Sequence, residues 1–408
     1  MRRYSRLVRL TDAGRTNGAI LSLSRRIATI LALAVCGFVP AAGRQPTHAS
    51  RCPDYPDAEG ISALAVAPER TLLAGTQGCG LYRSADGGHR WTRLAAYPTA
   101  IWTGIVLVLP ARPSTLLAGS SAAKSKEGPL GLERSEDGGA TWTSHMAGLP
   151  TGFAPVQLAA SARGTLVLSY RCLQTRCPRE LARSDDGGRS WQDVGPDTPA
   201  DVGFGIAGGV VPLADGSFLS AEAQSLSQGQ TLSRFYRSAD DGRTWMSVGT
   251  PPLSLDDLST LSAVPWDARQ VFAGFGLLFL SAHLDRSSDG GRRWSRVWVR
   301  KRSTHEDAAP EEFVIAFAAL PRTHTLLFST LRHIYRSTDD GASWTRSDRG
   351  LIATSDTTLT NATPAIWTLL SDPTGATVYA GTFASYGQSA VYQSTDDGRS
   401  WRAIATGV

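Results

Sequence analysis

The chain has 408 residues, of which 42% are apolar and 41 are glycine. That apolar share is large enough for a core, so the composition excludes a disordered or collagen-like chain. The formal net charge is +5, but removing residues 1–43 leaves 34 of the 41 basic and 35 of the 36 acidic residues. The remaining body is close to neutral, and its charge gives no argument for nucleic-acid binding.

Residues 1–43 have the features of an export leader. An apolar run at 27–39 follows Arg25 and Arg26 and ends at Pro40 and small residues, which is the pattern of a secretory signal. As a helix this run would rise about 20 Å, short of the roughly 30 Å hydrocarbon core of a bilayer. We therefore expect a secreted, periplasmic or cell-surface protein cleaved near Gly43, with membrane contact only through a leader that is kept. The arginine pair also permits a twin-arginine signal.

Four cysteines follow the leader, and an even number outside the cytoplasm favours disulfides over free thiols. Cys172 and Cys177 bracket four residues between two predicted strands, so a bridge across that loop is expected. Cys52 and Cys79 would then join an N-terminal extension (44–60) to the body. No CxxC pair occurs and the histidines are scattered, so we predict neither a metal site nor a cofactor.

One motif recurs through the whole body. The pattern Ser-x-Asp-x-Gly-x-x-Trp occurs seven times, and successive tryptophans lie 49–57 residues apart. Its chemistry is that of a turn, because short oxygen-bearing side chains accept backbone N–H bonds, glycine allows positive φ, and tryptophan packs the turn against its own sheet. The aspartates are Asp86, Asp137, Asp186, Asp240, Asp289, Asp339 and Asp396, and the tryptophans are Trp91, Trp142, Trp191, Trp245, Trp294, Trp344 and Trp401.

The alternative for the motif is seven cation or catalytic sites. Identical copies at a period of about 50 residues point outward around a ring and cannot converge on one substrate. We therefore interpret the motif as structural.

Each repeat predicts four strands. Apolar runs such as 61–68 and 71–76 come before each motif, and a proline often ends the first of them, as expected where a strand stops. Each unit then has strand A, a tight turn, strand B, a variable loop, strand C, the motif turn and strand D. Repeated seven times, this predicts an all-β fold over 61–408: a seven-bladed β-propeller with four antiparallel strands per blade and the motif in the C–D turn.

The seven motifs resemble the Asp-box (BNR) repeats of sialidases, sortilin-type receptors, xyloglucanases and photosystem II assembly-factor propellers. The resemblance covers nearly all of 61–408. It implies the fold and leaves the function open, because the shared residues are the structural turns.

The prediction separates two faces of the ring. The A–B and C–D turns lie on one face, and the B–C and D–A loops, which vary in length, lie on the other, where function is expected. On the loop-bearing face Trp102 and Trp367 occupy matching positions at the start of strand A, and Phe204 is similarly placed in a third blade. They are either platforms for a sugar or peptide or residues that close the channel mouth and pack between blades. The further binding candidates on this face are Tyr386, Glu311 and Glu312.

Signatures of an enzyme are weak in the sequence. A related sialidase would carry Arg-Ile-Pro where this chain has Ile61-Ser62-Ala63, and xyloglucanases place one acid on each of two propellers, whereas one propeller is predicted here. The acidic pairs at 256–257 and 311–312 have no fixed separation of the kind a glycosidase needs. No G-x-S-x-G elbow or phosphate-binding loop occurs, so we predict no catalytic residue.

From these features we expect an exported, non-catalytic propeller that binds a protein or peptide partner, as the resemblance to assembly factors implies. Two alternatives stay open. One is an extracytoplasmic glycoside hydrolase, of exo-sialidase-like type, and the other is a lectin-like glycan binder that uses Trp102, Trp367 and Tyr386 as stacking surfaces.

Overall fold

The computed structural model describes residues 60–405 with gaps at 99–100, 124–130, 146, 173–178, 197–205, 226–230, 250–256, 278–280, 301–312, 352–364 and 384–389. These described residues belong to one compact unit. The predicted leader (1–43) and most of the extension (44–60) lie outside them, so both stay predictions. Within the described residues no helix combines the length and hydropathy that a membrane span requires.

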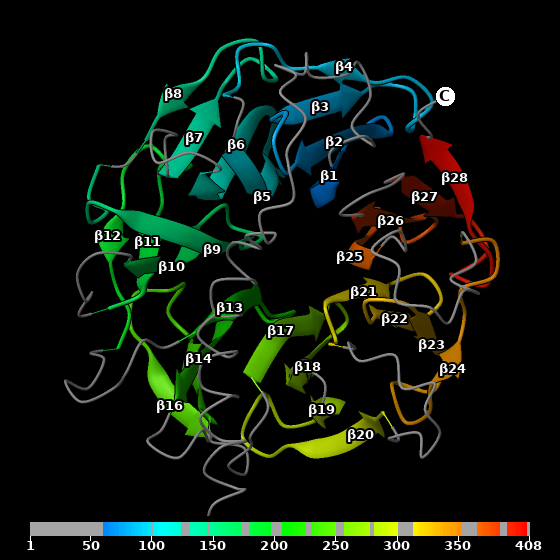
Figure 1. Cartoon of the computed structure of the whole chain (residues 1–408). Coiled ribbons are helices and arrows are strands. Elements are labelled where there is room, and N and C mark those ends of the chain that lie inside the picture. The colour runs from blue at the N-terminus through cyan, green and yellow to red at the C-terminus, as the bar shows by residue number, and fades with distance from the viewer. Residues whose placement is uncertain are drawn as a thin grey trace, which may run out of the picture. The chain divides into compact units, whose positions relative to one another are not determined.

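Seven four-stranded antiparallel sheets form a ring around a central channel (Figure 1), each built from four consecutive strands. The innermost strands A are β1 (Ile61–Ala67), β5 (Ile101–Leu109), β9 (Phe153–Ala160), β13 (Ile206–Pro212), β17 (Asp257–Val264), β21 (Ala316–Leu320) and β25 (Ala365–Ser371). Strands B are β2 (Thr71–Thr76), β6 (Arg112–Ala123), β10 (Leu166–Cys172), β14 (Phe218–Ser225), β18 (Asp267–Leu277), β22 (Thr325–Ser329) and β26 (Val378–Phe383).

The two outer strands complete each blade. Strands C are β3 (Leu81–Ser84), β7 (Gly131–Ser135), β11 (Leu181–Ser184), β15 (Thr231–Ser238), β19 (Ser281–Ser287), β23 (Ile334–Ser337) and β27 (Val391–Ser394). Strands D are β4 (Thr92–Arg93), β8 (Thr143–Ser144), β12 (Gln192–Asp193), β16 (Met246–Gly249), β20 (Ser295–Val299), β24 (Thr345–Arg346) and β28 (Arg402–Ala405). The prediction of an all-β, seven-bladed propeller with four antiparallel strands per blade is confirmed.

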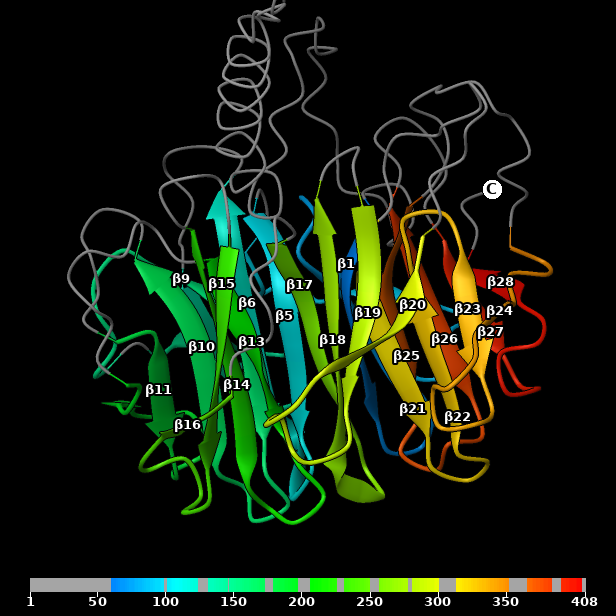
Figure 2. The ribbon, with the colours of Figure 1, turned by 90° about the horizontal axis from the view of Figure 1, so that it is seen from below.

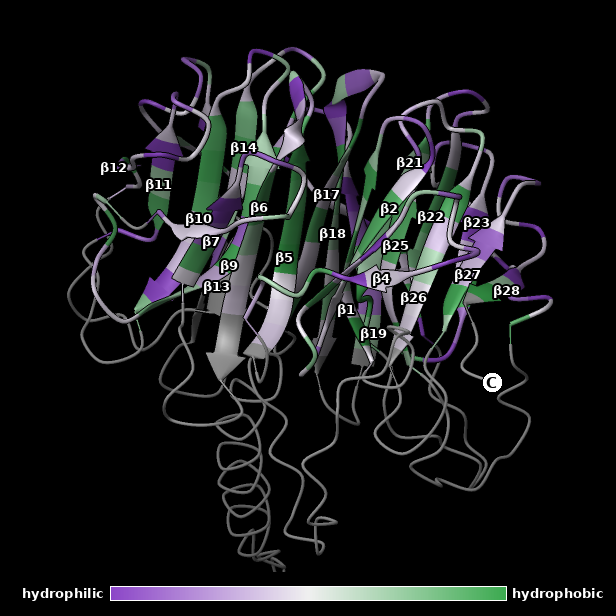
Figure 3. Ribbon diagram, turned by 90° about the horizontal axis from the view of Figure 1, so that it is seen from above, coloured by the Kyte–Doolittle hydropathy of each residue, from purple (hydrophilic) through white to green (hydrophobic). Residues whose placement is uncertain are grey.

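All strands run between two faces of the ring, as the side view in Figure 2 shows. We call the face with the A–B turns and motif turns the turn face, and the opposite one, with the B–C and D–A connections, the loop face. The inner strands are buried on both sides, because each sheet is packed between two others. All six residues of β2 are buried, and the inner strands are the most hydrophobic part of the ring (Figure 3).

The described ring closes through side chains rather than through an exchanged strand. Blade 1 consists of β1–β4 and blade 7 of β25–β28, so both blades are continuous in sequence. At their interface Ile61 and Trp91 of blade 1 pack with Tyr379 and Val391 of blade 7. A role for residues 52–60 in sealing this junction stays a prediction, because nearly all of them lie outside the described part.

Each motif forms the same hydrogen-bonded turn. The serine hydroxyl donates to the aspartate carboxylate at 2.7–2.9 Å in all seven copies. The amide of the motif glycine donates to the serine oxygen at 2.8–2.9 Å in all seven. These glycines have φ between 79° and 98°, a conformation that other residues adopt at a cost.

The motif tryptophans reach beyond their own sheet and pack against the preceding blade as well. Trp294 of blade 5 stacks on Phe235 of blade 4 with ring centroids 4.4 Å apart. Trp191 shares a buried cluster with Leu117 and Leu132 of blade 2. The sequence analysis expected each tryptophan to pack against its own sheet, and in the structure these side chains are also part of the contact between blades.

An arginine adds a second contact between blades. Arg134 donates from Nε to the carbonyl of Gly187 in the next blade at 2.8 Å. Arg183 and Arg336 make the same 2.8 Å bond to the residue that follows the motif aspartate of the next blade. This arginine precedes the motif serine in six of the seven copies and is replaced by Gln393 in the seventh. The sequence analysis did not use this repeated Arg-Ser pair, which was the available signal.

We expect replacement of a buried motif tryptophan to destabilise the ring strongly. Trp191 is 5% exposed, so Trp191→Ala should lower the free energy of unfolding by about 3–5 kcal/mol, measured by chemical denaturation. Met246, which is 73% exposed, provides the control, since Met246→Ala should change stability by less than about 0.5 kcal/mol. A loss below about 1 kcal/mol for Trp191→Ala would contradict the packing described here.

The motif carboxylates predict a loss of stability in acid. The pKa of every motif aspartate lies below its usual value; hydrogen bonds from the Ser343 hydroxyl and amide and from Ser337 lower that of Asp339 to about 2. A depressed folded-state pKa stabilises the fold above the unfolded value near 3.9 and ceases to do so as the pH falls through the folded value.

The midpoint of urea unfolding should therefore be nearly constant from about pH 7 to pH 5 and fall steadily between about pH 4 and pH 2. In Asp339→Asn the midpoint should be lower at neutral pH and should fall less steeply in acid, because one titrating carboxylate is gone. A wild-type midpoint that stays flat down to about pH 2.5 would show that these bonds contribute nothing to stability.

Candidate functional site

Of the six predicted binding residues, two lie within the described part of the chain, and both are on the loop face. Trp102 lies near the start of β5 and Trp367 near the start of β25, both at the inner edge of the ring. The other four predicted candidates, Phe204, Tyr386, Glu311 and Glu312, lie outside the described residues.

The two tryptophans lie together although 264 residues separate them. Their ring centroids are 6.0 Å apart and their planes are tilted by 53°. They come from blades 2 and 7, the two neighbours of blade 1, so the pair spans the start of β1 at the channel mouth. Both side chains are half-buried, and each therefore keeps part of its surface open. The two tryptophans, which the sequence placed at equivalent positions of two blades, are in direct contact in the structure.

Tight backbone packing fixes the strands that hold this pair. The Ser62 hydroxyl of β1 donates to the carbonyl of Thr103 in β5 at 2.7 Å. On the other side of β1, a Cβ on Gly381 would lie 2.6 Å from methyl groups of Ile61 and Thr368, so only glycine fits there. The inner strands of blades 7, 1 and 2 are thus held in close contact, and the tryptophan pair is built on a rigid support.

A polar cluster lies at the loop-face end of blade 6. His333 Nδ1 and the Asp348 carboxylate are 2.8 Å apart, and Arg346 Nε donates to the same carboxylate oxygen at 2.7 Å. Burial opposes ionisation of Asp348, but the bonds from His333 and Arg346 lower the pKa of its carboxyl. Tyr335 lies edge-on to His333, with ring centroids 6.3 Å apart. The sequence analysis did not identify this cluster, because its members lie on two segments of the blade, at the start of β23 and at the end of β24.

A second acidic position lies near the loop-face end of blade 4. Glu222 of β14 is paired in register with Arg234 of β15. Burial, followed by the charge of Glu222, raises the pKa of the nearby Tyr236. The arrangement places a half-buried carboxylate beside an arginine at the loop-face end of this blade.

Within the described residues, no three His, Cys, Asp or Glu side chains are grouped closely enough to hold a metal ion. Cys79 and Cys172 are both disulfide-bonded. Their predicted partners, Cys52 and Cys177, lie outside the described part, so the two pairings stay predictions.

No protein-family model matches the chain. A xyloglucanase from a Paenibacillus species is 29% identical over an alignment of 230 positions, which covers 48% of this chain and 21% of that enzyme. Among solved structures, an ancestral GH74 enzyme superposes with a TM-score of 0.58 at 15% identity, covering 86% of this chain and 47% of that one. YCF48 bound to a D1 peptide has a TM-score of 0.53 at 12% identity, covering 85% of this chain and 96% of that one.

These comparisons change the functional expectation. The two structural likenesses establish only the fold, since it supports unrelated functions. The sequence relative is an enzyme, and this chain spans about a fifth of its length. The expectation of a non-catalytic scaffold for a protein or peptide partner is therefore wrong, and the glycoside hydrolase alternative is favoured. Nothing in the comparisons supports the exo-sialidase-like form of that alternative.

Proposed function

We propose that this protein is an exported glycoside hydrolase that acts on a β-linked glucan of the xyloglucan type at its loop face. The observation that carries the proposal is the 29% identity over 230 residues to a xyloglucanase. Such an extent goes beyond the seven short motifs, which by themselves are shared by propellers of many functions.

The tryptophan pair supports a sugar-binding loop face. Pyranose rings present flat C–H faces, and an indole offers a large, rigid apolar surface on which such a face packs. Trp102 and Trp367 meet at 6.0 Å and are tilted by 53°, which leaves no room for a ring between them. A sugar therefore packs on their open faces across the channel mouth.

Glycoside hydrolysis also needs two carboxyl groups with different protonation states. The candidates are Asp257, Glu311 and Glu312, whose side chains lie outside the described part, together with Glu222. Asp348 is unsuited to the role of general acid, because its bonds to His333 and Arg346 keep it ionised. We propose that the general acid and its partner come from Asp257, the first residue of β17, and from Glu311 and Glu312 in the D–A connection between β20 and β21.

The activity is tested with the exported chain on xyloglucan, mixed-linkage glucan and cellulose, by measuring released reducing ends. Release from xyloglucan is expected, with a fall of about 100-fold or more in Glu311→Gln, Glu312→Gln or Asp257→Asn if that residue is one of the two catalytic carboxyls. Arg163→Gln, an exposed change on the turn face, is the control and should leave the rate unchanged. Absence of release from every glucan would overturn the proposal.

The tryptophan pair gives a separate prediction. Trp102→Ala and Trp367→Ala should each raise KM for xyloglucan by about tenfold, because each removes stacking worth about 1 kcal/mol or more. The matched control is Trp266→Ala, since Trp266 is also half-buried but stacks on His324 at the turn face. If the control raises KM as much as the two loop-face variants do, the pair is not a sugar platform.

A further inference from the structure

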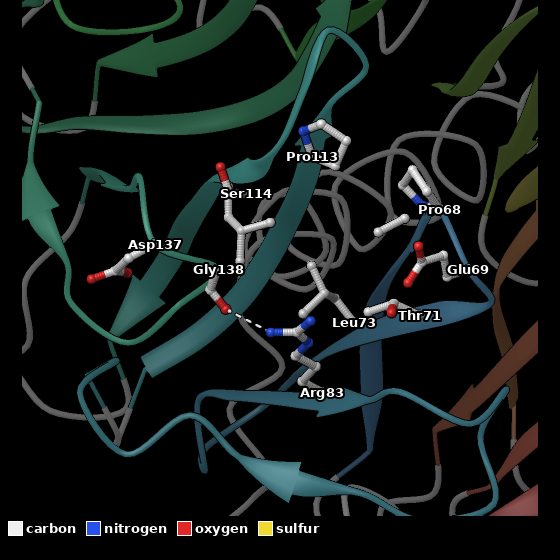
Figure 4. A pocket seen from close by; sticks show the side chains of 11 residues that line it. Pro68, Glu69, Thr71, Leu73, Arg83, Pro113, Ser114, Asp137 and Gly138 are labelled. Atoms are coloured by element: carbon white, nitrogen blue, oxygen red, sulfur yellow. Dashed lines mark hydrogen bonds between the residues drawn. The ribbon is translucent and has the colours of Figure 1, made fainter.

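A cavity of about 390 Å³ lies between blades 1 and 2 on the turn face (Figure 4), away from the tryptophan pair. Its apolar lining includes Leu73, Leu116, Pro68 and Pro113, and its charged lining is Glu69, Arg83 and Asp137. The Asp137 carboxylate is engaged within its own motif turn, where it accepts hydrogen bonds from Ser135 and Thr141. This volume is at the small end of the range of roughly 300–1,000 Å³ for ligand pockets.

The cavity has a simple cause in the sequence. Ala67 ends strand A of blade 1, and Leu109 holds the corresponding position in blade 2. At the interface of blades 2 and 3, the Leu109 methyl lies 3.5 Å from the Cβ position of Gly187, which follows the motif aspartate. At the interface of blades 1 and 2, Ala67 and Gly138 line the open space instead. The smaller side chain leaves the room that leucine fills one blade further on.

The arginine contact also differs at this interface. Arg134, which joins blades 2 and 3, is 2% exposed and donates to Gly187 at 2.8 Å. Its counterpart Arg83 is exposed and makes one long bond, 3.4 Å, to the carbonyl of Gly138. Arg83 forms no ion pair with any described residue, and its guanidinium points into the cavity (Figure 4).

A carboxylate lines the same cavity from the A–B turn of blade 1. Glu69 and Arg70 have φ of 59° and 61°, and the amide of Thr71 closes the turn on Pro68 at 3.3 Å. Two consecutive positive φ values are usually supplied by asparagine and glycine, so this turn holds Glu69 in a conformation that costs energy. Glu69 forms no ion pair within the described part of the chain, and it does not pair with Arg83.

We propose that this cavity binds a free α-amino acid with an apolar side chain. An unpaired guanidinium and an unpaired carboxylate on one pocket match the two charges of a zwitterion, and the apolar lining matches its side chain. The α-carboxylate accepts hydrogen bonds from Arg83, the ammonium group pairs with Glu69, and the side chain packs on the exposed Pro68 and Pro113. The site is independent of the proposed hydrolase activity and can succeed or fail without it.

The proposal is tested by calorimetric titration of the full chain with leucine, N-acetylleucine and leucinamide. Leucine should bind, and the two derivatives, which each lack one charge, should bind at least about tenfold more weakly. Arg83→Gln should remove the preference for leucine over leucinamide, and Glu69→Gln should remove the preference for leucine over N-acetylleucine. Arg163→Gln, in the A–B turn of blade 3, should bind leucine as the wild type does.

A cavity-filling variant tests the location. Ala67→Leu should abolish leucine binding while the thermal midpoint stays unchanged or rises, because the leucine fills the space as Leu109 does in the next blade. Absence of leucine binding to the wild type would overturn the proposal. Equal affinity for all three compounds, or undiminished binding to a folded Ala67→Leu variant, would overturn it as well.

Discussion

The contact between a motif turn and the preceding blade is the interaction on which this structure depends. In each blade the serine, aspartate and glycine fix a turn, and the turn then presents a tryptophan to two sheets at once. Where an arginine of the preceding blade donates to the carbonyl beside the motif aspartate, as Arg134, Arg183 and Arg336 do, the same turn is also hydrogen-bonded across the interface. Because this contact between a motif turn and the preceding blade recurs around the ring, the ring closes between blades 7 and 1 without an exchanged strand.

Because these contacts between motif turns and preceding blades lie at the turn face, they do not occupy the loop face. The inner edge of the loop face is rigid because its strands are closely packed at positions such as Gly381. This rigid support holds Trp102 and Trp367 in contact. A change of residue at one of the interfaces between blades has a different effect. The alanine at position 67 lines a cavity at one interface, and the amino-acid site that we propose lies there.

The functional expectation failed for a physical reason. The seven motifs dominate the sequence, but their residues are used in turns that every propeller of this kind needs, whatever it binds. They therefore supported a resemblance to scaffold proteins as well as to hydrolases, and the sequence analysis preferred the scaffold. The alignment with a xyloglucanase, 29% identical over 230 residues, favours the hydrolase alternative.

The sequence by itself determined the number of blades, the four strands in each and the two faces, because these follow from a strict repeat and from local turn chemistry. It also identified Trp102 and Trp367 as equivalent positions. Only the tertiary structure decided that the two tryptophans touch, that Arg134 bonds to Gly187, and that Arg83 and Glu69 line one cavity. Each of these contacts joins different blades, and the distance between blades is set by side-chain volumes summed around the ring. A local sequence pattern therefore does not determine the distance between blades.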